Sequence, residues 1–225
     1  MDNNLSRNIG AISEEEQSRL ARSHVFVAGC GGLGGYAVEL LARIGVGAIT
    51  TADSGCFQES DLNRQILATT ASMERRKVLV ASERARLINP GIVFTAIDAS
   101  MDSQNLPGFI DGCDIAIDAL DNKSTRKALF EACQKKGIPI VHGAIQGWQG
   151  QAAFALLPST NLYSLLYQDS EGSSPKEPVS VLSFTASYVA SIQVSLAARH
   201  LCGRRVGEKL YTFDLLEMGI EAYSL

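Results

Sequence analysis

Residues 24–53 are HVFVAGCGGLGGYAVELLARIGVGAITTAD, and this stretch decides the fold. Its apolar runs at 24–28 and 48–52 predict two strands, and the spacing over 33–44 predicts a helix between them. The first strand leads into residues 29–34 (GCGGLG), a G-x-G-x-x-G turn at the start of the helix. Glycines there let the backbone approach a phosphate, and the helix N-terminus supplies free N–H groups and a positive dipole.

Asp53 follows Gly29 by 24 positions and stands at the end of the second expected strand. A carboxylate at this place accepts hydrogen bonds from a ribose hydroxyl in proteins that bind nucleotides. The glycine turn and Asp53 together predict a nucleotide site. They fit NAD and ATP equally well, so the choice between the two depends on the residues that follow.

Strands and helices alternate through the first two thirds of the chain. Further strands are expected at 92–97, 114–119 and 138–141, separated by helices at 77–88 and 124–136. Asn89-Pro90 ends the first of these helices, and Gly137 caps the second. This alternation requires right-handed crossovers. It predicts an α/β fold with a Rossmann-like, mostly parallel sheet flanked by helices.

The C-terminal third has a different pattern, with shorter apolar runs and one long helical stretch. The expected elements are antiparallel strands at 151–156 and 162–167, a mobile loop at 169–178, a helix at 180–202, and strands near 209–214 and 220–225. The mostly parallel sheet is therefore expected to end in antiparallel strands.

Length and composition are those of an ordinary globular protein. The chain has 225 residues, of which 46% are hydrophobic and 20% charged, so a single domain over residues 1–225 is expected. The formal net charge of −4 argues against nucleic acid as a partner, because binding phosphates along a backbone needs a basic face.

No segment predicts export, a membrane span or a zinc site. The polar, acidic start at residues 1–17 lacks the features of a signal peptide. Residues 179–198 carry no charge, but their many polar side chains predict a buried or interface helix rather than a membrane span. The 5 cysteines include no CxxC pair, which fits a reducing compartment. We therefore expect a cytoplasmic protein without zinc.

Basic and amide side chains follow Asp53. Residues 61–65 are DLNRQ, and Lys77 comes after them. Transfer of a nucleotidyl group builds negative charge on the α-phosphate and the leaving pyrophosphate, and fixed cations stabilise that charge. Arg64 suits this role as a bidentate clamp and Lys77 as a point charge, whereas an NAD site needs neither. We therefore expect ATP in the site.

Residues 118–122 (DALDN) lie at the end of the fourth expected strand. Ligands of open parallel sheets bind at the carboxyl ends of the strands, so Asp121 is placed to hold Mg²⁺ on the triphosphate. A second interpretation is that Asp121 or Asn122 caps the helix that follows. Both interpretations hold together if one residue caps while the other coordinates.

These motifs and their order resemble the ThiF/MoeB/HesA family, the bacterial relatives of the ubiquitin-activating enzymes. The resemblance is carried by residues 29–34, Asp53, residues 62–65, Lys77, residues 88–90 (INP), residues 118–122, residues 142–144 (HGA) and residues 150–151 (GQ). Near the start, residues 6–9 (SRNI) resemble the segment with the family's N-terminal arginine, which reaches into the active site of the other subunit.

The resemblance implies a reaction. A small ubiquitin-like or sulfur-carrier protein that ends in Gly-Gly presents its C-terminal carboxylate to the α-phosphate of ATP, an acyl adenylate forms, and pyrophosphate leaves. The catalytic residues that it implies are Arg7, Arg64, Lys77 and Asp121. The residues expected to bind the nucleotide are Gly29, Gly31, Gly32, Gly34, Asp53, Asn63, Arg64, Gln65, Lys77, Leu120, Asp121 and Asn122.

The resemblance also implies an assembly and a division of labour along the chain. Arg7 would complete the neighbouring site, so a homodimer is expected. Residues 1–150 form the nucleotide-binding half, and residues 151–225 form the half that binds the carrier and the second subunit.

Several positions depart from the family's usual pattern. Residues 161–164 (NLYS) stand where many members have the first CxxC pair, and the tail has only Cys202. Gly55 replaces a second Asp, and Asp61 replaces the Asn that usually starts the Asn-Leu-x-Arg-Gln run. Residues 168–179 contain no cysteine, so we expect carrier activation without covalent sulfur transfer.

Two other functions stay open on the sequence. An NAD-dependent oxidoreductase fits the glycine turn, and a non-catalytic nucleotide-binding partner of an activating enzyme fits the departures at Gly55 and Asp61. Retention of Arg64, Lys77 and Asp121 argues against the second of these.

Four further residues are given no catalytic role. Cys30 and Cys56 are expected to act as small hydrophobic residues. His142 is expected to be a hydrogen-bonded core histidine. Trp148, the only tryptophan, either flanks the groove for the carrier's tail or packs against the core.

Overall fold

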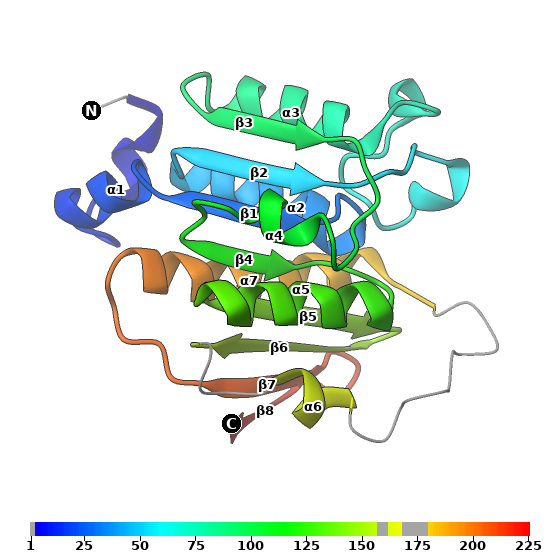
Figure 1. The fold of residues 1–225 in the computed structure, drawn as a ribbon. Coiled ribbons are helices and arrows are strands. Elements are labelled where there is room, and N and C mark those ends of the chain that lie inside the picture. The colour runs from blue at the N-terminus through cyan, green and yellow to red at the C-terminus, as the bar shows by residue number, and fades with distance from the viewer. Residues whose placement is uncertain (1–2, 157–161, 168–179) are drawn as a thin grey trace.

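One sheet of eight strands forms the centre of the computed structural model, which describes residues 3–156, 162–167 and 180–225 (Figure 1). The strand order is β3-β2-β1-β4-β5-β6-β7-β8. The strands are β1 (His24–Ala28), β2 (Ala48–Ala52), β3 (Val93–Ile97), β4 (Ile115–Asp118), β5 (Ile140–Gln146), β6 (Gln149–Ala155), β7 (Lys209–Asp214) and β8 (Gly219–Ser224).

The sheet changes from parallel to antiparallel at β6. β3, β2, β1, β4 and β5 are parallel to one another, and β5–β6, β6–β7 and β7–β8 are antiparallel pairs. The expected α/β class with antiparallel strands in the C-terminal third is confirmed. The carboxyl ends of the five parallel strands all point to the right of Figure 1, so the loops that follow them gather at one edge.

Helices cover both faces of the sheet. α2 (Gly32–Ile44), α3 (Lys77–Ile88) and α7 (Ser183–Leu201) lie on one face, and α4 (Leu106–Phe109), α5 (Lys123–Lys136) and α6 (Leu162–Tyr167) lie on the other (Figure 1). Val25 and Val27 belong to the first core, and Phe26 and Ala28 to the second. Because both faces are buried, the parallel strands are continuous apolar runs rather than alternating ones.

The remaining elements are short. A 3-10 helix η1 (Asn3–Asn8) and α1 (Glu14–Leu20) precede the sheet, and the 3-10 turns η2 (Glu59–Asp61) and η3 (Thr70–Ser72) follow β2. The sequence analysis placed no element at these positions or at α4.

The expected strand at residues 162–167 is wrong, because this segment is the helix α6. Leu162 is fully buried and Leu166 is partly buried, which is the i, i+4 spacing of one helix face, while Leu165 is 59% exposed. An apolar run of this length fits a strand and a helix turn equally well, so its packing partner, α5, decides the outcome. The expected loop at 169–178 lies outside the described residues.

The long uncharged stretch forms α7 and packs against α2, β5 and β6. Its polar Thr185 and Gln193 are fully buried, as expected for a buried or interface helix. Gln193 Nε2 donates to the backbone oxygen of Asp118 at 2.8 Å, and its amide fills the space above Gly143, where a Cβ would lie 2.4 Å away. No helix within the described ranges is long and apolar enough to cross a membrane.

Candidate active site

The glycine turn between β1 and α2 is tightly packed at two of its positions. Gly29 has a φ of +94°, which favours glycine, and a Cβ there would lie 3.2 Å from the backbone oxygen of Ala119. A Cβ at Gly34 would lie 1.9 Å from the backbone oxygen of Gly29, so no larger residue fits. The backbone alone therefore requires glycine at both positions.

Gly31 and Gly32 have no such constraint. Both residues are partly exposed, and a Cβ on either would meet neighbouring side chains at 3.9 Å, which is ordinary van der Waals contact, so a small side chain would fit there. α2 begins at Gly32, and its N-cap Gly31 has no side chain to accept from the first N–H groups, which have no partner within a helix. An open approach and unpaired N–H donors are what a phosphate needs.

Asp53 is fixed beside this turn. Its Oδ2 accepts from the N–H of Cys30 at 2.8 Å, and its Oδ1 accepts from the N–H of Gly55 at 2.7 Å. These bonds hold the carboxylate at the carboxyl end of β2, next to the glycines. The structure thus places the expected ribose-binding acid and the expected phosphate loop together.

Arg64 and Lys77 also come together at this edge of the sheet. Arg64 Nη1 donates to the backbone oxygen of Ser60 at 2.6 Å and to Asn63 Oδ1 at 2.9 Å. Arg64 Nη2 and Lys77 Nζ each lie 3.4 Å from a carboxylate oxygen of Asp61. Asp61, which was not among the expected site residues, therefore contacts both of the cations that the sequence predicts.

The amide residues of this segment have structural partners. Gln65 is 6% exposed, and its Nε2 donates to Asp61 Oδ1 at 2.5 Å. Asn63 Nδ2 donates to the backbone oxygen of Val181 at 3.2 Å, which ties the segment to the residues just before α7. These bonds fix the segment; contact of Asn63 and Gln65 with a nucleotide stays a prediction.

The two interpretations of residues 118–122 are separated by the geometry. Asn122 Oδ1 accepts from the N–H of Thr125 at 2.8 Å, so Asn122 is the N-cap of α5. Asp121 is exposed at the carboxyl end of β4 and is not the cap. Leu120 is 7% exposed, and its side chain lies 4.0 Å from where a Cβ on Gly29 would be. Leu120 therefore supports the glycine turn.

A buried polar network lies directly behind this loop, and the sequence analysis missed it. Arg126 of α5 is 5% exposed and contacts Asp118, His142, Tyr167 and the backbone oxygen of Leu120. His142 Nδ1 lies 2.7 Å from Asp118 Oδ2. The network joins the end of β4, His142 within β5, and the two helices α5 and α6.

The charges within this network are set by burial and by neighbours. Burial favours the neutral carboxyl of Asp118, but Arg126 and His142 outweigh it and hold its pKa below the usual value. Burial lowers the pKa of His142. The expectation that His142 is a hydrogen-bonded core histidine agrees with its 0% exposure and its contacts.

Arg7 is not near its own chain's phosphate loop. It is an exposed residue of η1, which packs against the C-terminal end of α2, where Asn8 Nδ2 donates to the backbone oxygen of Ile44 at 3.4 Å. α2 has 13 residues between that end and the glycine turn, a length of about 20 Å. The structure therefore does not bring Arg7 together with the other predicted site residues.

Cys30, Cys56 and Trp148 differ in how far they are buried. Cys30 is fully buried with its sulfur 3.1 Å from Thr51 Oγ1, and burial raises the pKa of its thiol to about 12. Cys56 is partly buried. Trp148 is 44% exposed and packs against Phe184, with ring centroids 4.9 Å apart.

Asp121 is an exposed carboxylate beyond the end of β4, and its part in holding a metal stays a prediction. Within the described ranges, no group of three or more His, Cys, Asp or Glu side chains is placed to enclose a metal ion. A single carboxylate suits Mg²⁺ that keeps several waters and binds substrate phosphates. The predicted absence of zinc stays a prediction.

Comparison with known proteins agrees with this geometry. The SAMP-activating enzyme E1 of Haloferax volcanii is 33% identical over 215 residues, which cover 93% of this chain and 79% of that protein. The sulfur carrier protein ThiS adenylyltransferase of Bacillus subtilis is 31% identical over 208 residues, which cover 91% of this chain and 62% of that protein. This chain thus spans less than two thirds of the Bacillus relative.

Solved structures share the fold. The Escherichia coli tRNA N6-threonylcarbamoyladenosine dehydratase in complex with ATP superposes with a TM-score of 0.76 at 25% identity, covering 89% of this chain and 94% of that chain. E. coli MccB superposes with a TM-score of 0.81 at 16% identity, which shows the fold alone. The family model described as the ThiF family matches residues 5–225. The chain therefore belongs to the ThiF family.

Proposed function

We propose that this protein uses ATP to adenylate the C-terminal carboxylate of a small ubiquitin-like or sulfur-carrier protein that ends in Gly-Gly. The observation that carries the proposal is the position of Arg64 and Lys77, which lie at the edge of the sheet that also holds the open glycine turn and Asp53. The relatives named as adenylyltransferases for carrier proteins support the same reaction.

The chain's own groups suffice for the chemistry of this reaction. A carboxylate is already an anionic nucleophile at neutral pH, so no general base is needed. Asp53 holds the ribose, and the N–H groups at Gly31 and Gly32 face the phosphates. Arg64 and Lys77 stabilise the charge that develops on the α-phosphate and on departing pyrophosphate. Positioning and charge neutralisation therefore do most of the work.

Asp121 is the residue proposed to hold Mg²⁺ on the triphosphate. It is exposed at the carboxyl end of β4, and the contact from Asn122 Nδ2 to Asp121 Oδ1 is long at 3.5 Å, so a cation competes well for the carboxylate. When bound, the ion would neutralise phosphate oxygens. Asp121 also carries a matched control in Asn122, whose loss removes a cap without removing a charge.

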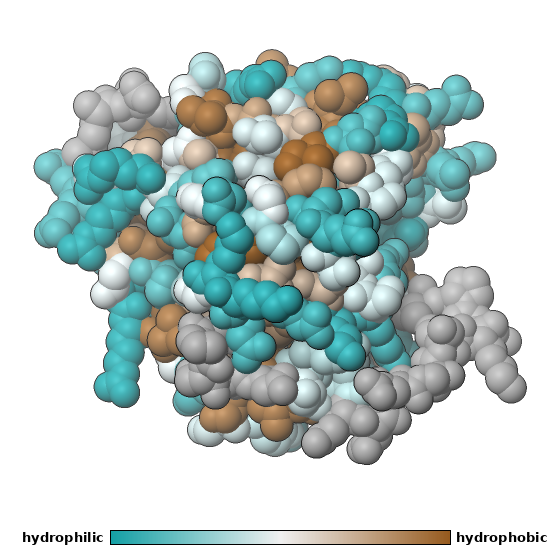
Figure 2. All heavy atoms as spheres, viewed as in Figure 1, coloured by the Kyte–Doolittle hydropathy of each residue, from teal (hydrophilic) through white to brown (hydrophobic). Residues whose placement is uncertain are grey.

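The carrier is proposed to dock on the C-terminal part of the sheet, within residues 151–225. β8 is the edge strand and is exposed over its whole length, and Leu216, Met218, Ile220 and Tyr223 are between 49% and 79% exposed. The view in Figure 2 shows brown, apolar atoms at the lower edge, where β8 lies. An exposed strand edge with apolar side chains is a surface to which another sheet can add.

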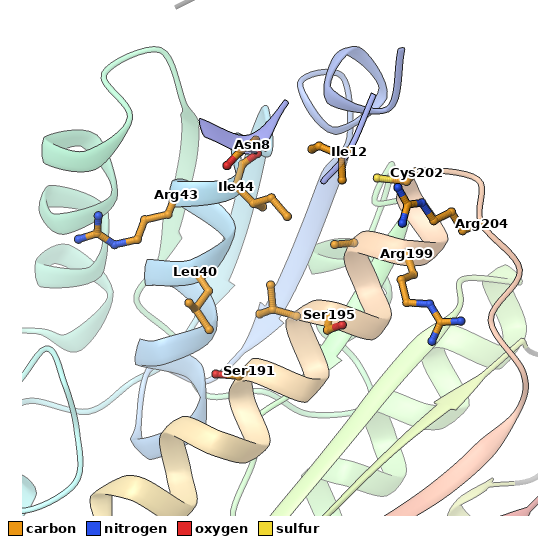
Figure 3. Close-up of a pocket in the computed structure, with 12 residues that line it drawn as sticks. Asn8, Ile12, Leu40, Arg43, Ile44, Ser191, Ser195, Arg199, Cys202 and Arg204 are labelled. Atoms are coloured by element: carbon orange, nitrogen blue, oxygen red, sulfur yellow. Dashed lines mark hydrogen bonds between the residues drawn. The ribbon is translucent and has the colours of Figure 1, made fainter. Parts of the chain in front are cut away.

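The homodimer is proposed to form on the groove between α2 and α7 (Figure 3). The groove has a volume of about 460 Å³, and its floor includes Leu40, Ile44, Val194 and Ala198. Arg43 and Arg199 point away from it in opposite directions. An apolar floor with a polar rim suits a second copy of this chain. η1, which contains Arg7, lies at the upper end of the groove (Figure 3), so a second copy bound in the groove would lie next to it.

A second substrate class is considered because the chain superposes on 94% of the E. coli enzyme named tRNA N6-threonylcarbamoyladenosine dehydratase. By sequence, the chain covers 58% of the Haemophilus influenzae dehydratase and 79% of the Haloferax activating enzyme, which favours the carrier. The net charge of −4 argues against tRNA, because phosphate contacts need a basic face. Exchange stimulated by tRNA rather than by a carrier would favour the dehydratase function.

Calorimetry and isotope exchange test the proposal. ATP–Mg²⁺ is expected to bind more tightly than NAD, because Arg64 and Lys77 suit a triphosphate.

ATP–pyrophosphate exchange is expected to require a carrier that ends in Gly-Gly and to fall about 10²-fold in Asp121→Asn. The control Asn122→Ala is expected to lower the free energy of unfolding by about 1 kcal/mol and to keep far more of the exchange. Tighter binding of NAD, or exchange by Asp121→Asn at the wild-type rate, contradicts the assignment.

A further inference from the structure

One carboxylate joins the two cations that are proposed to act on the phosphates. Asp61 is 6% exposed. Its Oδ1 lies 3.4 Å from Arg64 Nη2, and its Oδ2 lies 3.4 Å from Lys77 Nζ. The N–H of Gln58 and the amide of Gln65 also donate to this carboxylate, at 3.1 and 2.5 Å. Asp61 is thus fixed by neutral donors and shared by two cations.

The lengths of these contacts indicate that Asp61 positions the two cations without binding them tightly. Charge-assisted N–H···O bonds are typically about 2.8 Å long, so contacts of 3.4 Å are loose. Arg64 already has closer neutral partners in Ser60 and Asn63. A phosphate therefore competes well for both cations. When no phosphate is bound, Asp61 reduces the repulsion between Arg64 and Lys77.

Gly55 lies next to the same lysine. A Cβ at Gly55 would lie 3.5 Å from Lys77 Cε and 3.0 Å from Asp53 Oδ1. A carboxylate carried at position 55 would therefore also reach Lys77. In this chain position 55 carries no side chain, and the buried negative charge beside Lys77 comes from Asp61 instead.

We propose that Asp61 is a positioning residue: it holds Arg64 and Lys77 in the arrangement that stabilises departing pyrophosphate, and it supplies the charge that Gly55 lacks. This inference rests on the proposed adenylation. It predicts an effect on turnover rather than on ground-state binding of ATP, because the phosphates of bound ATP attract the cations without help. Precise placement of the cations matters most when charge builds up in the transition state.

The variant Asp61→Asn removes the charge and keeps the shape. Gln65 Oε1 is buried with no hydrogen-bond partner in the described part of the chain. If the Gln65 amide turns over, the new Asn amide donates to this oxygen, and the Asn oxygen still accepts from the N–H of Gln58. The variant is therefore expected to fold with a melting temperature close to that of the wild type.

ATP–pyrophosphate exchange tests the proposal through the separation of kcat from KM. Asp61→Asn is expected to lower kcat about tenfold and to leave the KM for ATP within about threefold. Adding Asp at position 55, in Gly55→Asp/Asp61→Asn, is expected to restore most of kcat. The matched control Gly55→Ala/Asp61→Asn adds a Cβ without a charge and is expected to restore nothing. Wild-type kcat in Asp61→Asn, or equal rescue by Ala and Asp, overturns the proposal.

A second measurement needs no nucleotide. Urea unfolding of the wild type, Asp61→Asn, Lys77→Met and the double variant forms a double-mutant cycle. Lys77→Met is expected to shift the urea midpoint more when Asp61 is present than when it is Asn. Additive shifts mean that Asp61 does not hold Lys77, and they overturn the proposal even if the protein proves to be an adenylating enzyme. A wild type that neither binds ATP–Mg²⁺ nor exchanges pyrophosphate instead contradicts the proposed function.

Discussion

At the scale of single residues, the glycines of the phosphate turn fall into two kinds. Gly29 and Gly34 are required by the backbone, because a Cβ at either position meets a carbonyl oxygen at 3.2 and 1.9 Å. Gly31 and Gly32 are partly exposed, and a Cβ at either position would fit without a clash. Packing explains the first pair, and the second pair is explained by a ligand that approaches the backbone.

This difference predicts opposite outcomes for two small substitutions. Gly34→Ala is expected to destabilise the protein by about 3 kcal/mol, because the backbone of Gly29 must move to accept the new methyl group. Gly32→Ala is expected to fold normally, because its methyl group meets neighbours only at van der Waals distance, and to weaken ATP binding, because the methyl group narrows the approach to the N–H groups of the turn. Thermal unfolding and calorimetry with ATP–Mg²⁺ check both. Normal ATP affinity in Gly32→Ala would place the phosphates elsewhere.

The residues that the sequence already places beside one another are those whose position depends on local chain context. Gly29, Gly34 and Asp53 follow directly from a strand, a turn and a strand end. The roles of Asp61 and Arg126 depend instead on partners that only the fold brings near, such as Lys77 for Asp61. No spacing in a single sequence reveals such a partner.

At the scale of elements, buried ionisable side chains connect α5 to the strands β4 and β5. Arg126 projects from α5 into a pocket with Asp118, from β4, and His142, from β5. Each of these side chains is at most 6% exposed. Because they are buried, their ionisation affects the stability of the fold directly.

The network predicts a loss of stability in weak acid. Burial lowers the pKa of His142 from 6.5, so below that pH the unfolded chain binds a proton that the folded chain does not. Its contribution is therefore complete above pH 6.5 and is lost as the pH falls. Unfolding in urea between pH 7.5 and 5 measures this slope.

The variants His142→Gln and His200→Gln measure how much each histidine contributes to the change of the unfolding free energy with pH. Burial also lowers the pKa of His200, but His142 is fully buried and His200 is not. Both variants are expected to flatten the pH dependence, and His142→Gln by more. An unchanged slope in His142→Gln would mean that the imidazole takes up its proton over the same pH range in the folded and the unfolded chain. The loss caused by Asp118 comes separately, below its usual pKa of 3.8.

Among the elements, length decided which predictions succeeded. The long helices and four of the five parallel strands were predicted within a few residues, because their apolar runs are flanked by clear ends such as Asn89-Pro90 and Gly137. The fifth, β5, was expected at 138–141 but runs from Ile140 to Gln146. α6 was predicted as a strand because its apolar run has only 6 residues. α1 was missed although Ser13 and Glu16 form a capping box, a signal that the sequence contains.

At the scale of the whole molecule, the sheet separates Arg7 from the rest of the predicted site. η1 packs against the C-terminal end of α2, and the glycine turn lies at the N-terminal end of α2. A role for Arg7 in catalysis therefore requires a second subunit. The groove between α2 and α7, which draws on both halves of the chain, is the surface proposed for that contact.

Mixing two inactive chains tests this arrangement. In a dimer of an Arg7→Ala chain with an Asp121→Ala chain, action in trans leaves one site with both residues intact, while action in cis leaves none. Random exchange makes half of the dimers mixed, and each has one intact site of two. About one quarter of the wild-type exchange activity is therefore expected. A mixture that stays inactive while both chains still dimerise shows that Arg7 does not act across the interface.

The reverse mixture is the control, and it gives a different number for each arrangement. A doubly substituted Arg7→Ala/Asp121→Ala chain is mixed in equal amounts with the wild type. If Arg7 acts in trans, every site of a mixed dimer lacks one of the two residues, so only wild-type dimers contribute and about one quarter of the activity remains. If Arg7 acts in cis, the wild-type chain of each mixed dimer stays active and about one half remains. Action in trans gives equal activities in the two mixtures, whereas action in cis gives activity in the second mixture alone. This comparison holds even when the treatment that exchanges subunits lowers the activity of both mixtures.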